Sequence, residues 1–541
     1  MESSHIHHNH FNVGLNPKFE PLTIPQTFID HRNDLLVSDE QIKHTSILTL
    51  LIEQLEPLDF HTLAYPQLGS LIKQSDELKR KLINSDGSFN NDETLANERE
   101  QWKAIQKEIN SFKLNTRHYL ILSIENLKKV AEENKWGVCK NHNFIYLFNG
   151  AYWSEIDREA FQEFLGQASE KMGIAKFLAR YFQFKEQLFK QFIGTGYLTT
   201  PEPSKDAVLI NLKNGTFEIT PKGNKLKPFQ RTDFITYQLP FEYDPNVVAP
   251  LFQSYLDQVL PDKERQMILA EYLGYVFIQP GTLKLEKVLL LYGTGANGKS
   301  VFFEVVTALL GSKNVSNYTL PSLTNENGYY RAKIANMLLN YVTEINGKLE
   351  AALFKQLASG EPVEARLPYG DPFTVNKYAK LMFNCNELPK DVEHTNAFFR
   401  RFLIVPFEVT IPEAEQDREL PSKIIANELS GVFNWVLAGL DRLLKHKKFT
   451  DSEAVRLAGE NYKLQSDSVR LFMDEAGYKK RPTEHTLLKD LYLEYRTFCS
   501  EDGYQSVGKT NFIKRLKGIG VLIERKTVGN VAYLTRSYMP F

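Results

Sequence analysis

The sequence feature that most constrains the fold is a glycine-rich segment that stands between two apolar runs. Residues 293–300 read Gly-Thr-Gly-Ala-Asn-Gly-Lys-Ser and match the pattern G-x-x-x-x-G-K-[ST]. Residues 287–292 before this segment form a short strand-like run, and residues 301–310 after it are compatible with a helix. A strand, a glycine loop and a helix in this order predict a phosphate-binding loop in an α/β fold.

The chemistry of such a loop explains its residue types. Backbone N–H groups of the turn and of the following helix converge on phosphate oxygens, and a side chain at a glycine position would block the approach. Lys299 would neutralise the β- and γ-phosphates of ATP, and the Ser300 hydroxyl would bind Mg²⁺. The residues predicted to bind nucleotide are Gly293, Thr294, Gly295, Ala296, Asn297, Gly298, Lys299, Ser300 and Val301.

Two later apolar runs end in polar residues that suit nucleotide hydrolysis. Residues 337–344 end in Glu344, whose carboxylate can hold the water shell of magnesium or polarise the attacking water. Residues 379–386 end in Asn386, whose amide can hydrogen-bond the γ-phosphate and that water. Strands also often end in Glu, and an Asn before a loop often caps a turn, so both interpretations stay open.

Arg400 and Arg401 come directly before a further apolar strand, residues 402–407. The guanidinium is always charged, and its planar fork suits phosphate. At a subunit edge, one of the two could reach a neighbour's nucleotide as an arginine finger. The alternative is a surface salt-bridge pair.

The rest of the chain divides by pattern. Residues 1–40 lack periodicity and predict a loose tail, in which His5, His7, His8 and His10 leave a metal-binding tract open as an alternative. Helical patterns fill residues 41–135, 249–276 and 413–450. Asn149-Gly150 and Asn214-Gly215 each predict a hairpin turn. Strands and helices alternate over residues 287–407.

The C-terminal stretch is the basic part of a nearly neutral chain. Residues 477–541 hold twelve Lys/Arg against six Asp/Glu, a net charge of +6, whereas the whole chain has -1. Their pattern reads helix, helix, hairpin, with Lys509, Lys514, Arg515 and Lys517 on the second helix. A recognition helix with a wing would bind duplex phosphates and a groove. A small capping domain with a solvated basic face is the alternative.

Composition excludes other classes. A length of 541 residues predicts about three to four domains. The three cysteines, Cys139, Cys385 and Cys499, are too few and too far apart for a disulfide scaffold or a CxxC zinc site. The sequence has no apolar run long enough for a membrane helix and no signal segment. We therefore expect a cytoplasmic protein with no membrane partner.

The lysine loop, Glu strand, Asn strand and Arg pair fall within about 100 residues in this order, and the set resembles a superfamily 3 helicase. More specifically, it is similar to the helicase half of the phage/plasmid and poxvirus primase–helicase family. Flanking segments share the resemblance, which covers roughly residues 136–541: residues 144–153, 211–219, 236–245, 271–277, 355–361 and 363–375.

The resemblance implies a multidomain α/β and α+β fold. Its core would be an AAA+-like P-loop NTPase, preceded by a helical and mixed N-terminal region and followed by a winged helix. The expected boundaries are residues 1–40 for the tail, 41–135 for the helical region, 136–280 for the helicase-associated region, 281–450 for the ATPase core and 451–541 for the DNA-binding end.

The resemblance also implies site roles. Lys299, Glu344, Asn386 and Arg400 or Arg401 would be catalytic, with Ser300 and Glu344 at the metal. Residues 364–373 match a hairpin that grips single-stranded DNA in a central channel; Arg366 would contact phosphate and Tyr369 would stack on a base.

Two features depart from the family pattern. Thr343 stands where many members have a second acid, which leaves one carboxylate for Mg²⁺. The hairpin tip reads Tyr369-Gly370-Asp371, where a basic residue would be expected, so Lys377 is a candidate substitute.

The sequence therefore predicts an ATP- and Mg²⁺-dependent DNA helicase that forms a ring, expected as a hexamer, in replication of a phage, plasmid or other mobile element. Residues 1–135 lack an Asp-x-Asp pair, so a separate primase and polymerase are expected as partners. Three alternatives stay open: an origin-binding initiator or helicase loader, a primase–helicase with an unrecognised primase part, and an RNA helicase.

Overall fold

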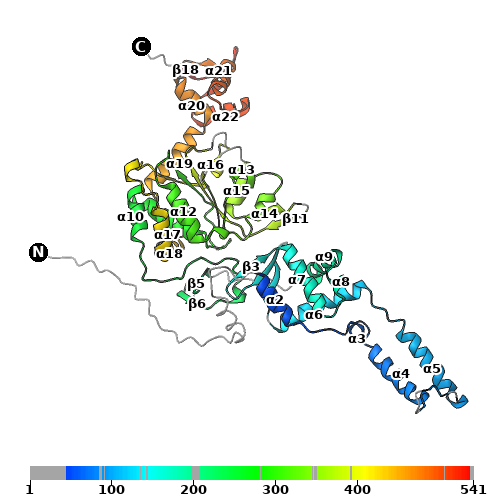
Figure 1. The fold of residues 1–541 in the computed structure, drawn as a ribbon. Helices are drawn as coiled ribbons and strands as arrows, with labels where there is room; N and C mark the ends of the chain where they lie inside the picture. The colour runs from blue at the N-terminus through cyan, green and yellow to red at the C-terminus, as the bar shows by residue number, and fades with distance from the viewer. Residues whose placement is uncertain are drawn as a thin grey trace.

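The computed structural model describes residues 44–84, 88–90, 92–134, 136–141, 144–196, 207–280, 282–343, 345, 350–368, 370–389, 393–504 and 506–536. The predicted histidine tail, Glu344 and Tyr369 lie outside the described residues. Within these ranges, no helix combines the length and the apolar character that a membrane crossing requires. The N-terminal and C-terminal parts lie at opposite ends of a central sheet (Figure 1).

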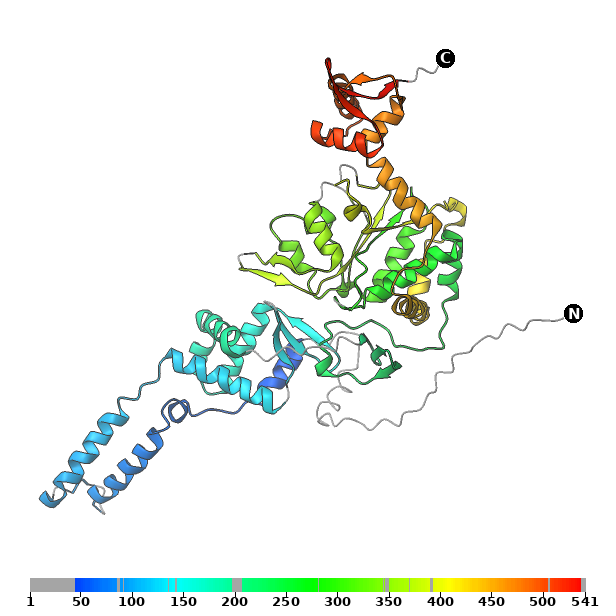
Figure 2. The ribbon, with the colours of Figure 1, turned by 180° about the vertical axis from the view of Figure 1, so that it is seen from behind.

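Helices dominate the N-terminal part, as the periodicity predicts. They are α2 (His44–Glu53), α3 (Phe60–Ala64), α4 (Leu68–Leu82), α5 (Ala96–Ile109) and α6 (Thr116–Glu133). Helix α6 begins at a capping box, where the Asn115 side chain accepts hydrogen bonds from the N–H groups of Arg117 and His118. Helices α4 and α5 pair as an arm that extends away from the rest of the molecule (Figure 2).

Two small antiparallel sheets follow. The first contains β1 (Val138–Asn141), β2 (Phe144–Phe148) and β3 (Trp153–Ile156), and the second β4 (Val208–Leu212), β5 (Gly215–Thr220) and β6 (Gly223–Lys227). Both predicted hairpins form, at β2–β3 and β4–β5. Sequence reasoning missed the third strand of each sheet, because β1 and β6 carry polar residues and too little apolar alternation. Helices α7 (Arg158–Lys171), α8 (Lys176–Ala179) and α9 (Phe182–Gln191) lie between the two sheets in the chain.

These two sheets pack with different neighbours. Residues from α2 and α6 share one hydrophobic cluster with residues from β1, β2 and α7. The expected boundary at residue 135 therefore runs through a continuous apolar contact. Residues of β4 and β5 belong instead to the cluster that underlies the central sheet.

The centre of the molecule is a five-stranded sheet in which every pair of neighbours is parallel. The strands are β7 (Val288–Tyr292), β8 (Val315–Ser316), β9 (Leu339–Val342), β12 (Lys380–Cys385) and β13 (Phe402–Pro406), in the spatial order β13-β7-β12-β9-β8. This confirms the predicted α/β layout. In such a sheet the carboxyl ends of the strands gather at one edge, so the loops after β7, β9 and β12 meet there.

Helices cover both faces of this sheet. Alternate strand residues point to opposite faces: Leu289 and Leu291 join the cluster of one face, and Val288 and Leu290 that of the other. The first face is covered by α10 (Pro250–Val259), α11 (Lys263–Tyr275), α12 (Lys299–Leu310), α17 (Leu420–Asn427) and α18 (Leu429–His446). The second is covered by α13 (Leu320–Leu323), α14 (Tyr329–Lys333), α15 (Ala351–Ser359) and α16 (Asn396–Phe399).

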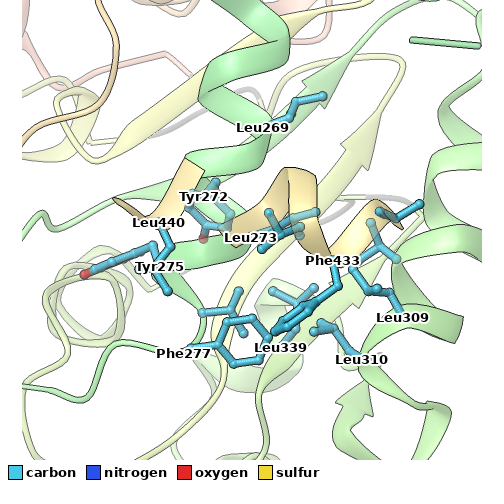
Figure 3. Packing of buried hydrophobic residues seen from close by; sticks show 14 of the residues in the cluster. Leu269, Tyr272, Leu273, Tyr275, Phe277, Leu309, Leu310, Leu339, Phe433 and Leu440 are labelled. Atoms are coloured by element: carbon cyan, nitrogen blue, oxygen red, sulfur yellow. The ribbon is translucent and has the colours of Figure 1, made fainter. Parts of the chain in front are cut away.

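Helices α11 and α18 approach each other closely on the first face (Figure 3). A Cβ atom on Gly439 of α18 would lie 2.3 Å from the Ala270 carbonyl carbon of α11. A Cβ atom on Gly274 of α11 would lie 2.7 Å from the Cβ atom of Leu440. The two glycines let the backbones meet, and Tyr272, Leu273 and Phe433 belong to the hydrophobic cluster of the same face.

Replacing Gly439 with alanine is therefore expected to destabilise the protein by about 2–3 kcal/mol, because the added Cβ overlaps the α11 backbone. Gly459 is the matched control, since nothing lies within 4 Å of its Cβ position. There, alanine should be neutral or stabilise the helix by about 0.5–1 kcal/mol. Denaturant unfolding measures both; equal midpoints for the two variants would contradict the packing account.

The C-terminal part has its own hydrophobic cluster, formed within residues 469–534. It follows α19 (Glu453–Gln465) and contains α20 (Ser468–Glu475), β14 (Tyr478–Lys480), β15 (Thr486–Leu487), α21 (Leu488–Glu501), α22 (Lys509–Gly518), β16 (Ile523–Lys526), β17 (Gly529–Ala532) and β18 (Leu534–Arg536). The predicted order of helix, helix and hairpin is present as α21, α22 and β16–β17. Strand β15 adds a third strand beside β17.

Candidate functional site

The glycine loop lies at the carboxyl edge of the central sheet, between β7 and the first turn of α12. Gly295 and Gly298 have φ angles of 119° and 82°, in the region that favours glycine. A Cβ atom on Gly298 would lie 2.7 Å from Cγ1 of Val259, and one on Gly293 would lie 2.4 Å from the Phe407 carbonyl oxygen. The loop is therefore held against α10 on one side and the end of β13 on the other.

Lys299 is buried at the start of α12, with 6% of its surface exposed. Its Nζ donates to the Gly293 carbonyl oxygen at 2.6 Å and to Oδ1 of Asn297 at 3.0 Å. Burial lowers the pKa of this ammonium group. Burial also raises the pKa of the neighbouring Cys385 thiol to about 12, so this group stays neutral.

The outer side of the loop is open to solvent at Thr294, Ala296 and Ser300. Asn297 is buried, and its Nδ2 donates to the Phe407 carbonyl at 3.2 Å. The loop therefore combines a buried ammonium group with exposed backbone N–H groups at the start of a helix. A nucleoside triphosphate needs both kinds of donor for its phosphate oxygens. The Ser300 hydroxyl lies on the exposed side, where it can bind a phosphate-bound Mg²⁺.

The register of the sheet brings Asn386 to the same edge. Cys385 pairs with Tyr292, and the Gly293 N–H donates to the Cys385 carbonyl at 3.1 Å. Asn386 follows immediately and is exposed. Strand β9 ends at Val342, which pairs with Phe383, so the segment that leads to Glu344 leaves the sheet at this edge too. The catalytic roles of Asn386 and Glu344 stay predictions.

Sequence reasoning missed two polar contacts of this edge. Tyr255, in α10, donates from Oη to the Gly298 carbonyl at 2.8 Å and so fixes the loop against α10. Asn384 is buried in β12, where its Oδ1 accepts from Oη of Tyr341 at 2.8 Å. The contact of Asn384 with Tyr341 could have been suspected, because an Asn stands inside an apolar strand. The contact of Tyr255 with Gly298 had no such signal, because the two residues are far apart in sequence.

The arginine pair lies at the opposite edge of the sheet. The Val288 N–H donates to the Arg401 carbonyl at 2.8 Å, which places both arginines beside the start of β7. The glycine loop follows the end of the same five-residue strand, about 16 Å away at the rise of a β-strand. Neither arginine is therefore placed at the loop of its own chain.

The two arginines differ in their surroundings. The Arg401 side chain is 9% exposed; its Nη2 donates to Oγ of Ser359 at 2.9 Å and lies 3.4 Å from the Glu286 carboxylate. The Arg400 side chain is 63% exposed and pairs with the same carboxylate at 2.9 Å. Burial alone would raise the pKa of Glu286, but Lys284 and the two arginines lower it below its usual value. Arg401 is thus fixed inside the fold, whereas Arg400 reaches the surface.

The predicted DNA-gripping segment forms a hairpin of β10 (Val363–Arg366) and β11 (Pro372–Val375). Arg366 is exposed, and its Nε donates to the Gly370 carbonyl at 2.8 Å, so it closes the turn. At the base, Nε of the buried Arg331 donates to the Glu364 carbonyl at 2.6 Å. Lys377, which follows β11, is only partly exposed.

The basic residues of α22 are not equivalent. Lys509, Lys514 and Lys517 are exposed, as a phosphate contact requires. Arg515 is half-buried, and its Nη1 lies 3.1 Å from Oδ1 of Asp467, the residue that caps α20. Arg515 therefore ties α22 to α20, and the three lysines form the accessible charge.

Comparison with known proteins identifies two family models. Residues 128–261 match the model described as "D5 N terminal like", and residues 291–401 match a family of unknown function, DUF5906. Both are associated with superfamily 3 helicases. The second match contains the glycine loop, β9, β12 and the arginine pair.

Two viral proteins are related in sequence. One, named "Putative helicase 121R", is from Invertebrate iridescent virus 3 and is 23% identical over 337 residues, which are 54% of this chain and 35% of that protein. Another, named "Putative helicase L207/L206", is from Acanthamoeba polyphaga mimivirus and is 24% identical over 167 residues, or 28% of this chain and 17% of that protein. The chain thus matches about a third or less of the length of these relatives.

Among solved structures, the apo C-terminal region of NrS-1 aligns with 76% of this chain and 98% of its own, at 13% identity and a TM-score of 0.39. The family models and the viral relatives confirm the resemblance predicted from the sequence, to the viral and phage primase–helicase family with its helicase-associated N-terminal region.

Proposed function

We propose that this protein is an ATP-dependent, ring-forming DNA helicase of superfamily 3 that acts in replication of a phage, plasmid or other mobile element. The observation that carries the proposal is the buried Lys299 ammonium, held by Gly293 and Asn297 beneath an exposed glycine loop. The helicase names of two viral relatives support it.

Each residue at the carboxyl edge then has a part in hydrolysis. The loop N–H groups and Lys299 bind the triphosphate, and Lys299 exchanges its bond to the Gly293 carbonyl for phosphate oxygens. Ser300 and Glu344 would hold Mg²⁺, which would neutralise charge on the phosphates. Asn386 donates to the γ-phosphate and orients the attacking water.

The position of the arginines supports assembly into a ring. Because Arg400 lies at the sheet edge opposite to its own loop, we infer that it serves a nucleotide bound by another subunit. We propose Arg400 as the finger, since it is exposed, and Arg401 as the residue that fixes its backbone. Six subunits is the number that the family resemblance implies.

DNA would contact two surfaces. One strand would pass along the β10–β11 hairpins in the central channel, where Arg366 is exposed beside the turn. Duplex DNA would contact the lysines of α22, with the β16–β17 hairpin as a wing.

ATP hydrolysis by the full chain, measured with and without single-stranded DNA and RNA, tests this proposal. We expect Mg²⁺-dependent hydrolysis that rises with single-stranded DNA, because strand binding at the hairpins would couple to the nucleotide site. Equal stimulation by RNA would contradict the DNA assignment. A protein that binds no ATP would contradict the proposal as a whole.

A second candidate is an origin-binding initiator or helicase loader, and the exposed Lys509, Lys514 and Lys517 favour it. Such a protein would hydrolyse ATP and bind a specific duplex without processive strand separation. Replacing the three lysines with glutamate in the full chain distinguishes the two. Loss of duplex binding with retained unwinding would leave the helicase assignment standing.

A further inference from the structure

Two lysines line a cavity that the proposed hydrolysis does not use. The cavity has a volume of about 30 Å³ and lies where residues 234–237, which lead from the second small sheet, cross the central part. Its polar side chains come from Lys377, Lys380, Gln279 and Asn336; apolar walls come from Phe234, Ile235 and Phe277. The space suits one small oxyanion group or one to two waters.

Neither ammonium group has an acidic partner among the described residues. Within the described ranges, no hydrogen bond or ion pair involves Nζ of Lys377, and Nζ of Lys380 lies over the ring of Tyr275, 4.1 Å from its centroid. Burial lowers the pKa of each lysine to about 8. Both lysines are partly exposed and both line the same cavity, so an anion bound there would face two positive charges.

Two acids of neighbouring elements are engaged elsewhere. Glu286 pairs with Arg400 and Arg401, and Glu361 lies 3.4 Å from Lys284. The Tyr378 hydroxyl, which also borders this region, donates to the Glu361 carbonyl at 2.8 Å. Among the described residues, no carboxylate forms an ion pair with Lys377 or Lys380.

The cavity lies at the base of the β10–β11 hairpin. Lys377 follows β11 by two residues, and its carbonyl accepts from the Asn336 N–H at 3.0 Å. Nδ2 of Asn336 donates to the Tyr146 hydroxyl of β2 at 2.8 Å, and its carbonyl accepts from Oγ1 of Thr236 at 3.3 Å. An anion bound here would lie where three segments meet: the base of the hairpin, residues 234–237 and the first small sheet.

We propose that Lys377 and Lys380 together bind a single phosphate group, either a phosphodiester of single-stranded DNA passing the hairpin base or a free phosphate ion. The Gln279 amide, which makes no side-chain hydrogen bond in the described structure, adds a neutral donor. The DNA arm of this proposal rests on the proposed function, whereas the free-ion arm does not.

The test uses the full chain in a Lys299→Ala background, so that the glycine loop contributes little anion binding. Three proteins are compared: the background alone, the background with Lys377→Gln and Lys380→Gln, and the background with Lys313→Gln as a control. Lys313 is exposed and lies outside the cavity. Calorimetric titration with sodium sulfate, at constant ionic strength set by chloride, measures anion binding, and titration with oligo(dT) measures strand binding.

We expect sulfate binding in the background and the control, and its loss in the protein with both glutamines. A parallel loss of about tenfold or more in oligo(dT) affinity would assign the site to DNA phosphate. Loss of sulfate binding with unchanged oligo(dT) affinity would assign it to a free anion. Unchanged binding of both probes would overturn the proposal. None of these outcomes depends on ATP hydrolysis, so failure here is distinct from failure of the helicase assignment.

The pH dependence gives a second readout. Sulfate keeps its charge across neutral and alkaline pH, whereas two lysines with a pKa of about 8 lose theirs. Between about pH 7 and about pH 9, sulfate affinity should fall by roughly 50- to 100-fold if both charges are needed. Affinity that is constant over this range would show that ordinary surface lysines bind the ion and would overturn the proposal. The glutamine variants remove charges that form no ion pair in the described structure, so we expect little change in thermal stability beyond the lost contact of Lys380 with the Tyr275 ring.

Discussion

Replacing Lys299 with alanine should lower the rate of ATP hydrolysis by about a hundred- to a thousandfold, the range seen when one preorganised donor of a transition state is removed. Lys299 is the buried cation nearest to the exposed loop, and its two partners, Gly293 and Asn297, are both part of that loop. No other side chain in the described loop carries a positive charge. The charge that develops on the phosphates would therefore lose its main partner.

The control for this variant is Lys313→Ala, a lysine that follows the same helix and is exposed. It should hydrolyse ATP at the wild-type rate. Steady-state phosphate release measures both variants, with circular dichroism to confirm folding. Retention of more than about a tenth of the activity in Lys299→Ala would contradict the assigned role.

Arg400→Ala should lower hydrolysis by about a thousandfold, the effect of removing an arginine finger, without changing the unfolding temperature. The exposed Arg400 contributes a surface pair with Glu286, which is worth little to stability. Arg401→Ala should instead destabilise the protein by about 2–3 kcal/mol, because it removes buried bonds to Ser359 and Glu286.

Mixing subunits tests whether Arg400 acts on a neighbour. Lys299→Ala and Arg400→Ala are each inactive alone, but in a mixed ring about a quarter of the interfaces join an intact loop to an intact arginine. Hydrolysis should therefore return when the two variants are combined. Failure to recover any activity, with mixed rings demonstrated by size, would contradict a role in trans.

The central sheet could be predicted because its strands are short apolar runs that end at recognisable polar residues. Other elements also have a local sequence signal and could be predicted for the same reason. They are the glycine loop, the hairpin turns at Asn149 and Asn214 and the two helices of the basic C-terminal stretch. Strands β1 and β6 escaped prediction because edge strands need little apolar character.

What depends on contacts between distant segments could not be predicted. Arg400 and Arg401 are adjacent in sequence, yet Arg401 is buried and Arg400 is exposed. The difference arises because α15 packs against β13, where Ser359 accepts a hydrogen bond from Arg401. Similarly, the sequence named Lys377 as a candidate DNA contact but gave no signal for Lys380, because the cavity that both lysines line exists only where residues 234–237 fold across them. The contact of Tyr255 with the glycine loop likewise joins two segments that are far apart in sequence.

In the proposed helicase, ATP hydrolysis at the Lys299 loop drives strand separation. The most direct measurement is unwinding of a forked DNA duplex with ATP and Mg²⁺, by wild type and by Lys299→Ala, on protein whose assembly is sized by chromatography. We predict unwinding by the wild type that disappears in Lys299→Ala. Hydrolysis of ATP without strand separation by the wild type would contradict the helicase assignment and favour the initiator or loader.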